Sequence, residues 1–211
     1  ICACLVGSEM CIRDRSSAVG FRNKAASENA SAVGYGNNAN ALAASAVGYN
    51  NTAGGVGSST IGYNNTATNE NASAFGYGNT AGGLASSAFG FSNTASGDNA
   101  NAFGYNNIAS GSKSNVFGTG NTVSGSSSTA VGTANEVAAE NSTAIGNNNT
   151  ISSGAENSAA LGNNISISLK DSVALGNNST ATAINSVTGN SSYTKWAGVS
   201  DVVGVVSVGS S

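Results

Sequence analysis

A glycine returns at every fourteenth position along most of this chain, each time after a small residue and a bulky apolar one. This glycine column is Gly20, Gly34, Gly48, Gly62, Gly76, Gly90, Gly104, Gly118, Gly132 and Gly146, followed after one slightly longer gap by Gly162 and Gly176. A fixed period on this scale is typical of proteins in which each repeat forms one coil of a stacked array. The period therefore predicts an all-β solenoid of about twelve 14-residue coils over residues 16–184.

The residues before each glycine alternate between small and bulky side chains. The alanine column lies two positions before the glycine, and the residue four positions before it is always Ser or Ala. The position directly before the glycine holds the bulky column: Val19, Val33, Val47, Ile61, Phe75, Phe89, Phe103, Phe117, Val131, Ile145, Leu161 and Leu175. Because successive side chains of a strand point to opposite faces, each coil has a strand with one small and one bulky face.

A second apolar column, mostly alanine, lies five residues after each glycine and predicts a second short strand in every coil. An asparagine column lies three residues after the glycine in the first ten coils, from Asn23 to Asn149. Asn tolerates left-handed backbone conformations and bonds its own backbone, so we expect it to form the turn between the two strands. Glycines of several coils mark the other turn: Gly55, Gly83, Gly97, Gly111 and Gly125.

A coil this short has a thin interior, so the small face is expected to point inward and the bulky column outward. An exposed ladder of this length is unfavourable on a monomer, and its burial would contribute about 1.5–3 kcal/mol per side chain. We therefore expect an intermolecular core. Its candidate residues are Val33, Val47, Ile61, Phe75, Phe89, Phe103, Phe117, Val131, Ile145, Leu161 and Leu175. Coils about 4.8 Å apart would form a rod on the order of 55 Å long.

Two departures from the register carry information. The longer gap before Gly162 is expected to form an enlarged turn at residues 153–156. An aromatic column follows the glycine in the first seven coils, and Thr or Asn replaces it in the last five. Its members are Phe21, Tyr35, Tyr49, Tyr63, Tyr77, Phe91 and Tyr105. These rings either thicken the intermolecular core in the N-terminal half or stack on one another at a turn.

Composition narrows the classes of function. The 211 residues include no His and no Pro, 8% are charged, and the net charge is −3. The basic patches that nucleic acid requires are missing, and no run of 18 apolar residues predicts a membrane span. No His or paired carboxylates suggest acid–base catalysis, so we expect neither an enzyme nor a bound metal or cofactor.

Both ends of the chain depart from the repeat. Residues 1–15 contain Cys2, Cys4 and Cys11, which without His or a fourth thiol make a poor metal site. We interpret this leader as foreign to the fold, since SEMCIRD resembles translated adaptor sequence. Residues 185–211, with the single Trp196, are interpreted as a transition segment leading towards a neck that the chain does not contain.

The repeats SAVG, SAFG, STAIG and DSVALG, together with the tail GVVSVGS at residues 204–210, resemble the YadA-like head of trimeric autotransporter adhesins. The resemblance covers residues 16–211. It implies a left-handed parallel β-roll, a homotrimer, and a place on the surface of a Gram-negative bacterium, anchored in the outer membrane by regions absent from this chain. It also implies binding to host matrix proteins, host cells or other bacteria.

The first functional hypothesis is therefore an adhesin head, in which weak contacts repeated over many coils add up as avidity. Its candidate exposed columns are Asn51, Thr52, Asn65, Thr66, Asn79, Thr80, Asn93 and Thr94. A second hypothesis is a spacer that holds a distal binding domain away from the cell. A third is an ice-binding solenoid, suggested by the threonines and weakened by Lys24, Ile108 and Glu136 in the same column.

Overall fold

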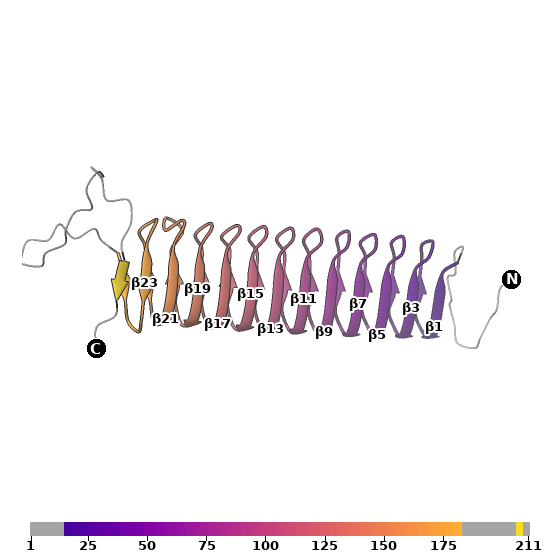
Figure 1. Cartoon of the computed structure of the whole chain (residues 1–211). Coiled ribbons are helices and arrows are strands. Elements are labelled where there is room, and N and C mark those ends of the chain that lie inside the picture. Colours follow the sequence, from indigo (N-terminus) through magenta and orange to yellow (C-terminus); the bar gives the residue numbers. More distant parts are fainter. Residues whose placement is uncertain (1–14, 183–205, 209–211) are drawn as a thin grey trace, which may run out of the picture.

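The computed structural model describes residues 15–182 and 206–208, which form a parallel β-solenoid with two strands in each coil (Figure 1). The odd-numbered strands form one 13-stranded parallel sheet in sequence order, and the even-numbered strands form a 12-stranded one. The predicted all-β solenoid, with one coil for each sequence repeat, is confirmed.

The strands of the first sheet are five residues long in most coils. They are β1 (Ser17–Phe21), β3 (Ser31–Tyr35), β5 (Ser45–Tyr49), β7 (Ser59–Tyr63), β9 (Ser73–Tyr77), β11 (Ser87–Phe91), β13 (Asn101–Tyr105), β15 (Asn115–Thr119), β17 (Thr129–Thr133), β19 (Thr143–Asn147), β21 (Ala159–Asn163), β23 (Val173–Leu175) and β25 (Val206–Val208).

The strands of the second sheet are two residues long. They are β2 (Lys24–Ala25), β4 (Asn38–Ala39), β6 (Thr52–Ala53), β8 (Thr66–Ala67), β10 (Thr80–Ala81), β12 (Thr94–Ala95), β14 (Ile108–Ala109), β16 (Thr122–Val123), β18 (Glu136–Val137), β20 (Thr150–Ile151), β22 (Ser166–Ile167) and β24 (Thr180–Ala181).

The register of the first sheet follows the glycine column. Gly20 pairs with Gly34, and Gly146 still pairs with Gly162 across the longer gap. The two extra residues lie between β20 and β21, where the connection spans residues 152–158 instead of the five residues 138–142 one coil earlier. The predicted enlarged turn is therefore confirmed, and each sequence column is a straight row along the rod.

The interior of each coil is thin and filled by small side chains. The alanine column and the second apolar column are both buried, as Ala88 and Ala95 illustrate, and the Ser or Ala four positions before each glycine is buried too. Larger side chains enter the second apolar column only toward the C-terminal end of the described coils, at Val123, Val137, Ile151 and Ile167. The predicted division into a small inner face and a bulky outer one is confirmed.

The turn residues differ from the sequence prediction. Left-handed backbone occurs two residues after the glycine, as at Asn50 and Asn106, and again five residues before the next one, as at Asn99. The asparagine column shows no positive φ. Gly97 and Gly111 also lack one, and their role is close approach: a Cβ on Gly97 would lie 2.2 Å from the carbonyl oxygen of Gly111. The left-handed role expected of the asparagine column was therefore wrong, whereas Gly97 and Gly111 do lie in the other turn, as predicted.

The asparagine column forms a buried ladder of side-chain amides. The Nδ2 of Asn93 donates to the carbonyl oxygen of Phe89 (2.9 Å), to that of Gly104 in the next coil (2.7 Å), and to the Oδ1 of Asn79 (3.1 Å). Its Oδ1 accepts from the backbone N (3.1 Å) and the Nδ2 (2.9 Å) of Asn107. Each buried amide is therefore satisfied by groups of its own coil and of both neighbours, as burial requires.

The ladder ends where the asparagine column ends. Asn149 is its last member, and Ile165 takes the equivalent place in the next coil, 1% exposed. The backbone N of Ile165 still donates to the Oδ1 of Asn149 at 3.0 Å. An apolar side chain, that of Ile165, therefore fills the ladder position in the coil that follows the last asparagine.

The first sheet continues beyond the twelve glycine-marked coils. Strand β25 pairs in parallel with β23, Val206 opposite Val173 and Val208 opposite Leu175. Part of the C-terminal tail thus adds one more strand to the sheet. The interpretations of residues 1–15 as a foreign leader and of residues 185–211, with Trp196, as a transition segment stay predictions, because apart from Arg15 and Val206–Val208 these residues fall outside the described ones.

Candidate interaction surfaces

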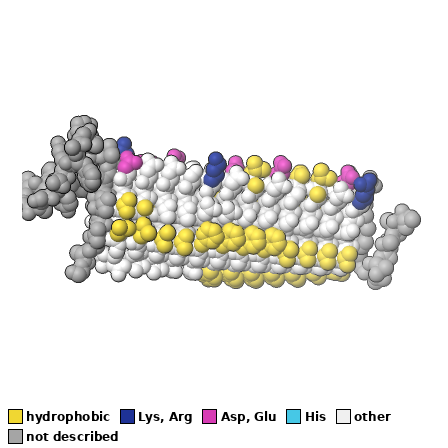
Figure 2. All heavy atoms as spheres, viewed as in Figure 1, with side chains coloured by type: hydrophobic (Ala, Val, Ile, Leu, Met, Phe, Trp, Pro, Cys, Tyr) yellow, Lys and Arg dark blue, Asp and Glu magenta, His cyan; other side chains and the backbone are white. Residues whose placement is uncertain are grey.

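The bulky column lies on the outer face of the first sheet and is half-exposed along its whole length, from Val19 to Leu175. The four phenylalanines in its middle stack on one another, with ring centroids 4.7–5.2 Å apart. Figure 2 shows the column as one continuous apolar stripe along the rod. All candidate residues of the intermolecular core therefore share one exposed face, as expected.

A second row shares this face with the bulky column, because it lies three positions before the glycine and the intervening alanine points inward. We call it the flanking column. It is Ser17, Ser31, Ser45, Ser59, Ser73, Ser87, Asn101, Asn115, Thr129, Thr143, Ala159 and Val173. Serine occupies the six coils nearest the N-terminus, and the side chains after Ser87 are larger, except at Ala159.

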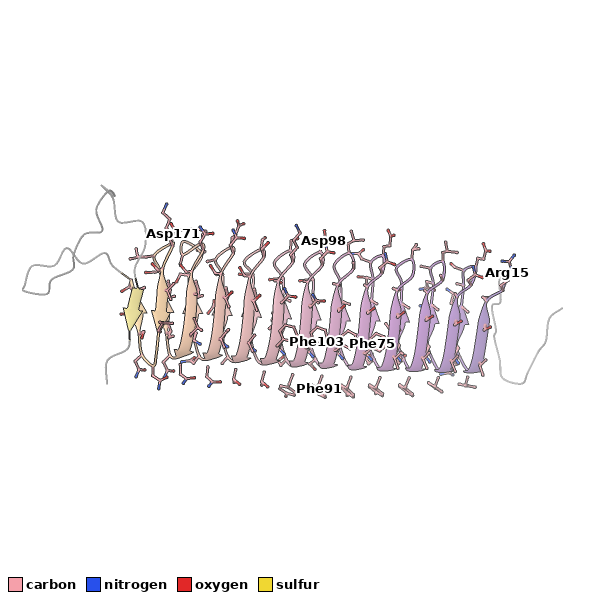
Figure 3. The ribbon with its side chains drawn as sticks, viewed as in Figure 1. Arg15, Phe75, Phe91, Asp98, Phe103 and Asp171 are labelled. Carbon is pink, nitrogen blue, oxygen red and sulfur yellow. The ribbon has the colours of Figure 1, made fainter. Side chains whose placement is uncertain are left out.

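The aromatic column follows the edge of the same face, on the other side of the bulky column (Figures 2 and 3). Its members are 37–53% exposed. Neighbouring rings stack with centroids 4.8–5.3 Å apart, from Phe21 to Tyr105. Stacking within the chain, one of the two alternatives, is thus observed. It leaves the ring edges and the tyrosine hydroxyls facing outward.

The opposite edge of the rod carries the charge. Its turn tips hold all charged residues of the described coils except Arg22, Lys24 and Glu136, and three of the tips are apolar instead (Figure 2). The charged tips are Arg15, Glu28, Glu70, Asp98, Lys113, Glu140, Glu156, Lys170 and Asp171, and the apolar ones are Leu42, Val56 and Leu84. The bulky and flanking columns carry no charged residue over residues 16–182.

Of the two columns predicted to be exposed, the asparagines are buried and only the threonines reach the surface. Asn51, Asn65, Asn79 and Asn93 are fully buried in the amide ladder, because the carbonyl groups of two coils need their Nδ2 donors. A ligand has no access to them, and their assignment to an exposed column was wrong. The threonines are half-buried on the outer side of the second sheet and stay candidates: Thr52, Thr66, Thr80 and Thr94.

The described residues show neither a metal-binding cluster nor a membrane-spanning helix. Among them, no group of three or more His, Cys, Asp or Glu side chains is placed to hold a metal ion. In the same part of the chain, no helix has the length and hydropathy needed to cross a membrane.

The sequence model of one protein family, described as the YadA head domain repeat (2 copies), matches the chain six times. The matched segments are 14–37, 25–51, 53–79, 81–107, 124–149 and 170–187, together more than half of the 211 residues. A search of curated proteins gives no match. Since the matched segments coincide with the coils and their glycine column, the chain belongs to the YadA head domain repeat family.

Proposed function

We propose that this chain is the head of a trimeric autotransporter adhesin, displayed on a bacterial cell surface and binding host matrix proteins, host cells or other bacteria. Membership of the YadA head family supports the adhesin role. The observation that carries the proposal is the long apolar face, which has no charge and lies opposite the charged edge. In this proposal three chains bury their bulky columns against one another and turn their charged edges outward, and each coil winds left-handed.

In this assembly the outer surface works by repetition. The half-buried threonines of the second sheet and the turn tips recur every coil on each of three chains. Contacts that are weak singly add up when several engage together, because the second contact is made at a high effective concentration. We propose no catalytic role and no cofactor for this head, and no insertion of these coils into a membrane.

The test is binding of a trimer-stabilised form of the chain to immobilised matrix proteins and to host and bacterial cells. An adhesin head is expected to bind at least one of them, with an apparent affinity that falls steeply when the same chain is held as a monomer. Uniform failure to bind would favour the spacer, in which the rod only sets a distance. Thermal hysteresis at micromolar protein would instead favour the ice-binding alternative.

Replacing Phe89 by Asp is expected to dissociate the proposed trimer. Each copy would place an unpaired carboxylate in an apolar seam, and an uncompensated buried charge costs about 3–5 kcal/mol. Sedimentation velocity measures the result. Leu84→Asp is the matched control, since Leu84 is a half-exposed apolar residue five positions away on the charged edge. If Phe89→Asp sediments like the unchanged chain, the bulky column does not lie between chains.

A further inference from the structure

The outer face carries three parallel rows whose sizes are matched across the bulky column. In the first six coils the flanking column is serine while the aromatic column is Phe or Tyr. In the last five coils the flanking positions hold Asn, Thr, Ala or Val, from Asn115 to Val173, and the aromatic positions are Thr or Asn, from Thr119 to Asn177. A small flanking residue therefore accompanies a ring in the first six coils, and residues of intermediate size accompany each other in most later coils; Asn101 with Tyr105 and Ala159 with Asn163 depart from this match.

The aromatic column is large enough to be a contact surface. Seven aromatic side chains of 150–250 Å² each, about 0.4 exposed, leave roughly 400–700 Å² of ring surface outside the coil. The largest apolar patch of a typical monomer is about 300–600 Å² in total, and here the bulky column adds to it. A standard interface covers about 800 Å² on each partner. The aromatic and bulky columns together have the size of such an interface.

A second copy of this chain fits this surface better than a carbohydrate does. A sugar stacks on the face of an aromatic ring, but neighbouring rings 4.8–5.3 Å apart already cover these faces. Only ring edges and hydroxyls are available, and they suit a neighbouring row of small side chains that lets the edges approach closely. The flanking serines, from Ser17 to Ser87, are such a row at the same spacing along the rod.

The bulky column alone does not tell a copy which way to lie. It consists of four aliphatic residues, four phenylalanines and four aliphatic residues, so its pattern is similar when read from either end. The aromatic column has no such symmetry, because it ends at Tyr105. In an antiparallel pair the aromatic columns would face each other with the ends exchanged, placing Tyr35 against Asn163 and Tyr49 against Asn147.

We infer that the aromatic column of one copy packs on the flanking column of the next, each coil against the same coil, and so fixes a parallel, in-register assembly. This inference rests on the homotrimer proposed above. Each copy offers the aromatic column on one side of its bulky column and the flanking column on the other. The contact is therefore head-to-tail: the aromatic column of each copy meets the flanking column of the next. Repeated around an axis parallel to the rods, it closes into a ring with the bulky columns inside.

The first test removes the rings. In Tyr35→Thr/Tyr49→Thr/Tyr63→Thr/Tyr77→Thr, each tyrosine becomes the residue that Thr119 and Thr133 provide in later coils. Because these tyrosines are exposed, the coils are expected to keep their circular dichroism spectrum while association weakens at least tenfold in sedimentation equilibrium. Leu42→Ser/Val56→Ser/Leu84→Ser, equally exposed at the charged edge, is the control and should associate normally. Unchanged association of the tyrosine variant would overturn the inference.

The second test reads the register directly, in full-length chains whose Cys2, Cys4 and Cys11 are replaced by Ser. A mixture of Thr129→Cys and Thr133→Cys chains is expected to cross-link with a short thiol reagent, because the two positions face each other in one coil. Neither chain alone should cross-link. The double variant Thr129→Cys/Thr133→Cys should yield a covalent ring of three. Cross-linking of Thr133→Cys to Tyr63→Cys, the antiparallel partner position, would overturn the inference.

The outcomes separate this inference from the proposed function. A trimer that forms without the tyrosines, or that gives none of the expected cross-links, refutes the role of the aromatic column and leaves the adhesin head intact. An unmodified chain that sediments as a monomer at all concentrations refutes the assembly itself and the inference with it. Binding to matrix proteins and cells is measured separately on the stabilised trimer, so its failure affects only the adhesin role.

Discussion

Replacing Asn107 by Asp is expected to destabilise the rod by about 3–5 kcal/mol at neutral pH, the range for an uncompensated buried charge. The Nδ2 of Asn107 donates to three acceptors: the Oδ1 of Asn93 (2.9 Å) and the carbonyl oxygens of Phe103 (3.0 Å) and Gly118 (2.7 Å). A carboxylate offers no donor, so all three acceptors would face a buried negative charge, towards which only the backbone N and the Nδ2 of Asn121 still donate. The effect should be largest in the coils around β13 and β15.

The pH dependence identifies the cause. Burial among carbonyl groups raises the pKa of the new carboxyl above its unfolded value of about 3.9. The folded state then holds the proton more tightly, so stability falls as pH rises from the unfolded pKa to the raised folded one. The melting temperature of Asn107→Asp, relative to that of the unchanged chain, should be lower at pH 7.5 than at pH 4.5.

The neighbouring Asn106 is the matched control. It is exposed, has a φ of 53°, and donates its backbone N to the carbonyl oxygen of Phe91. Asp tolerates this left-handed conformation, so Asn106→Asp should melt within a few degrees of the unchanged chain at both pH values. Equal melting of the two variants would show that the amide ladder does not hold the coils together.

The repeat predicted the coils because each constraint recurs twelve times. The alternation of Ala88 and Phe89 in one coil could arise in a helix or a loop, but small residues two and four positions before the glycine, with a bulky one between them and the glycine in every coil, favour a strand. Identical residues one period apart then fix the register, since a slip by one residue would put a bulky side chain into the thin interior. The inward alanines, the outward bulky column and the enlarged turn at residues 153–156 all followed from this reasoning.

The role of the asparagine column was missed because Asn suits two environments. It is common in left-handed turns and equally able to satisfy buried carbonyl groups. Parity was the available signal: Asn93 and Ala95 are two positions apart, so in extended backbone they point to the same side, and Ala95 is part of the core. The left-handed positions were less visible because they vary in sequence, from Asn50 and Gly78 to Ala134.

Contacts between chains lie beyond what a repeat alone specifies. The sequence indicates that the bulky column is apolar and points outward. Which row of a neighbouring chain the bulky column meets depends on where the flanking and aromatic columns lie beside it. Their positions are known only once the two sheets and the turn at the glycine are known. The size match between Ser45 and Tyr49 within one coil has meaning only when both are known to flank the same face.

Replacing Gly118 by Ala is expected to cost more than about 4 kcal/mol, an effect of exceptional size for a single methyl group. Gly118 has a φ of 128°, which L-residues rarely adopt, and a Cβ there would lie 1.9 Å from the carbonyl oxygen of Gly132. That oxygen also accepts the Nδ2 of Asn121 at 2.8 Å. The methyl group would therefore strain the backbone, separate two coils and break a rung of the amide ladder.

Gly120→Ala, two residues away, is the control. Gly120 has a φ of 63° with no atom within 4 Å of an added Cβ, and Ala134 already occupies the equivalent position one coil later with a φ of 55°. Its cost should be about 1 kcal/mol, that of a left-handed alanine. Chemical denaturation of both variants compares them directly. Equal stability would contradict coils stacked this closely, whereas a large difference shows that the periodic glycine is required by the approach of the next coil.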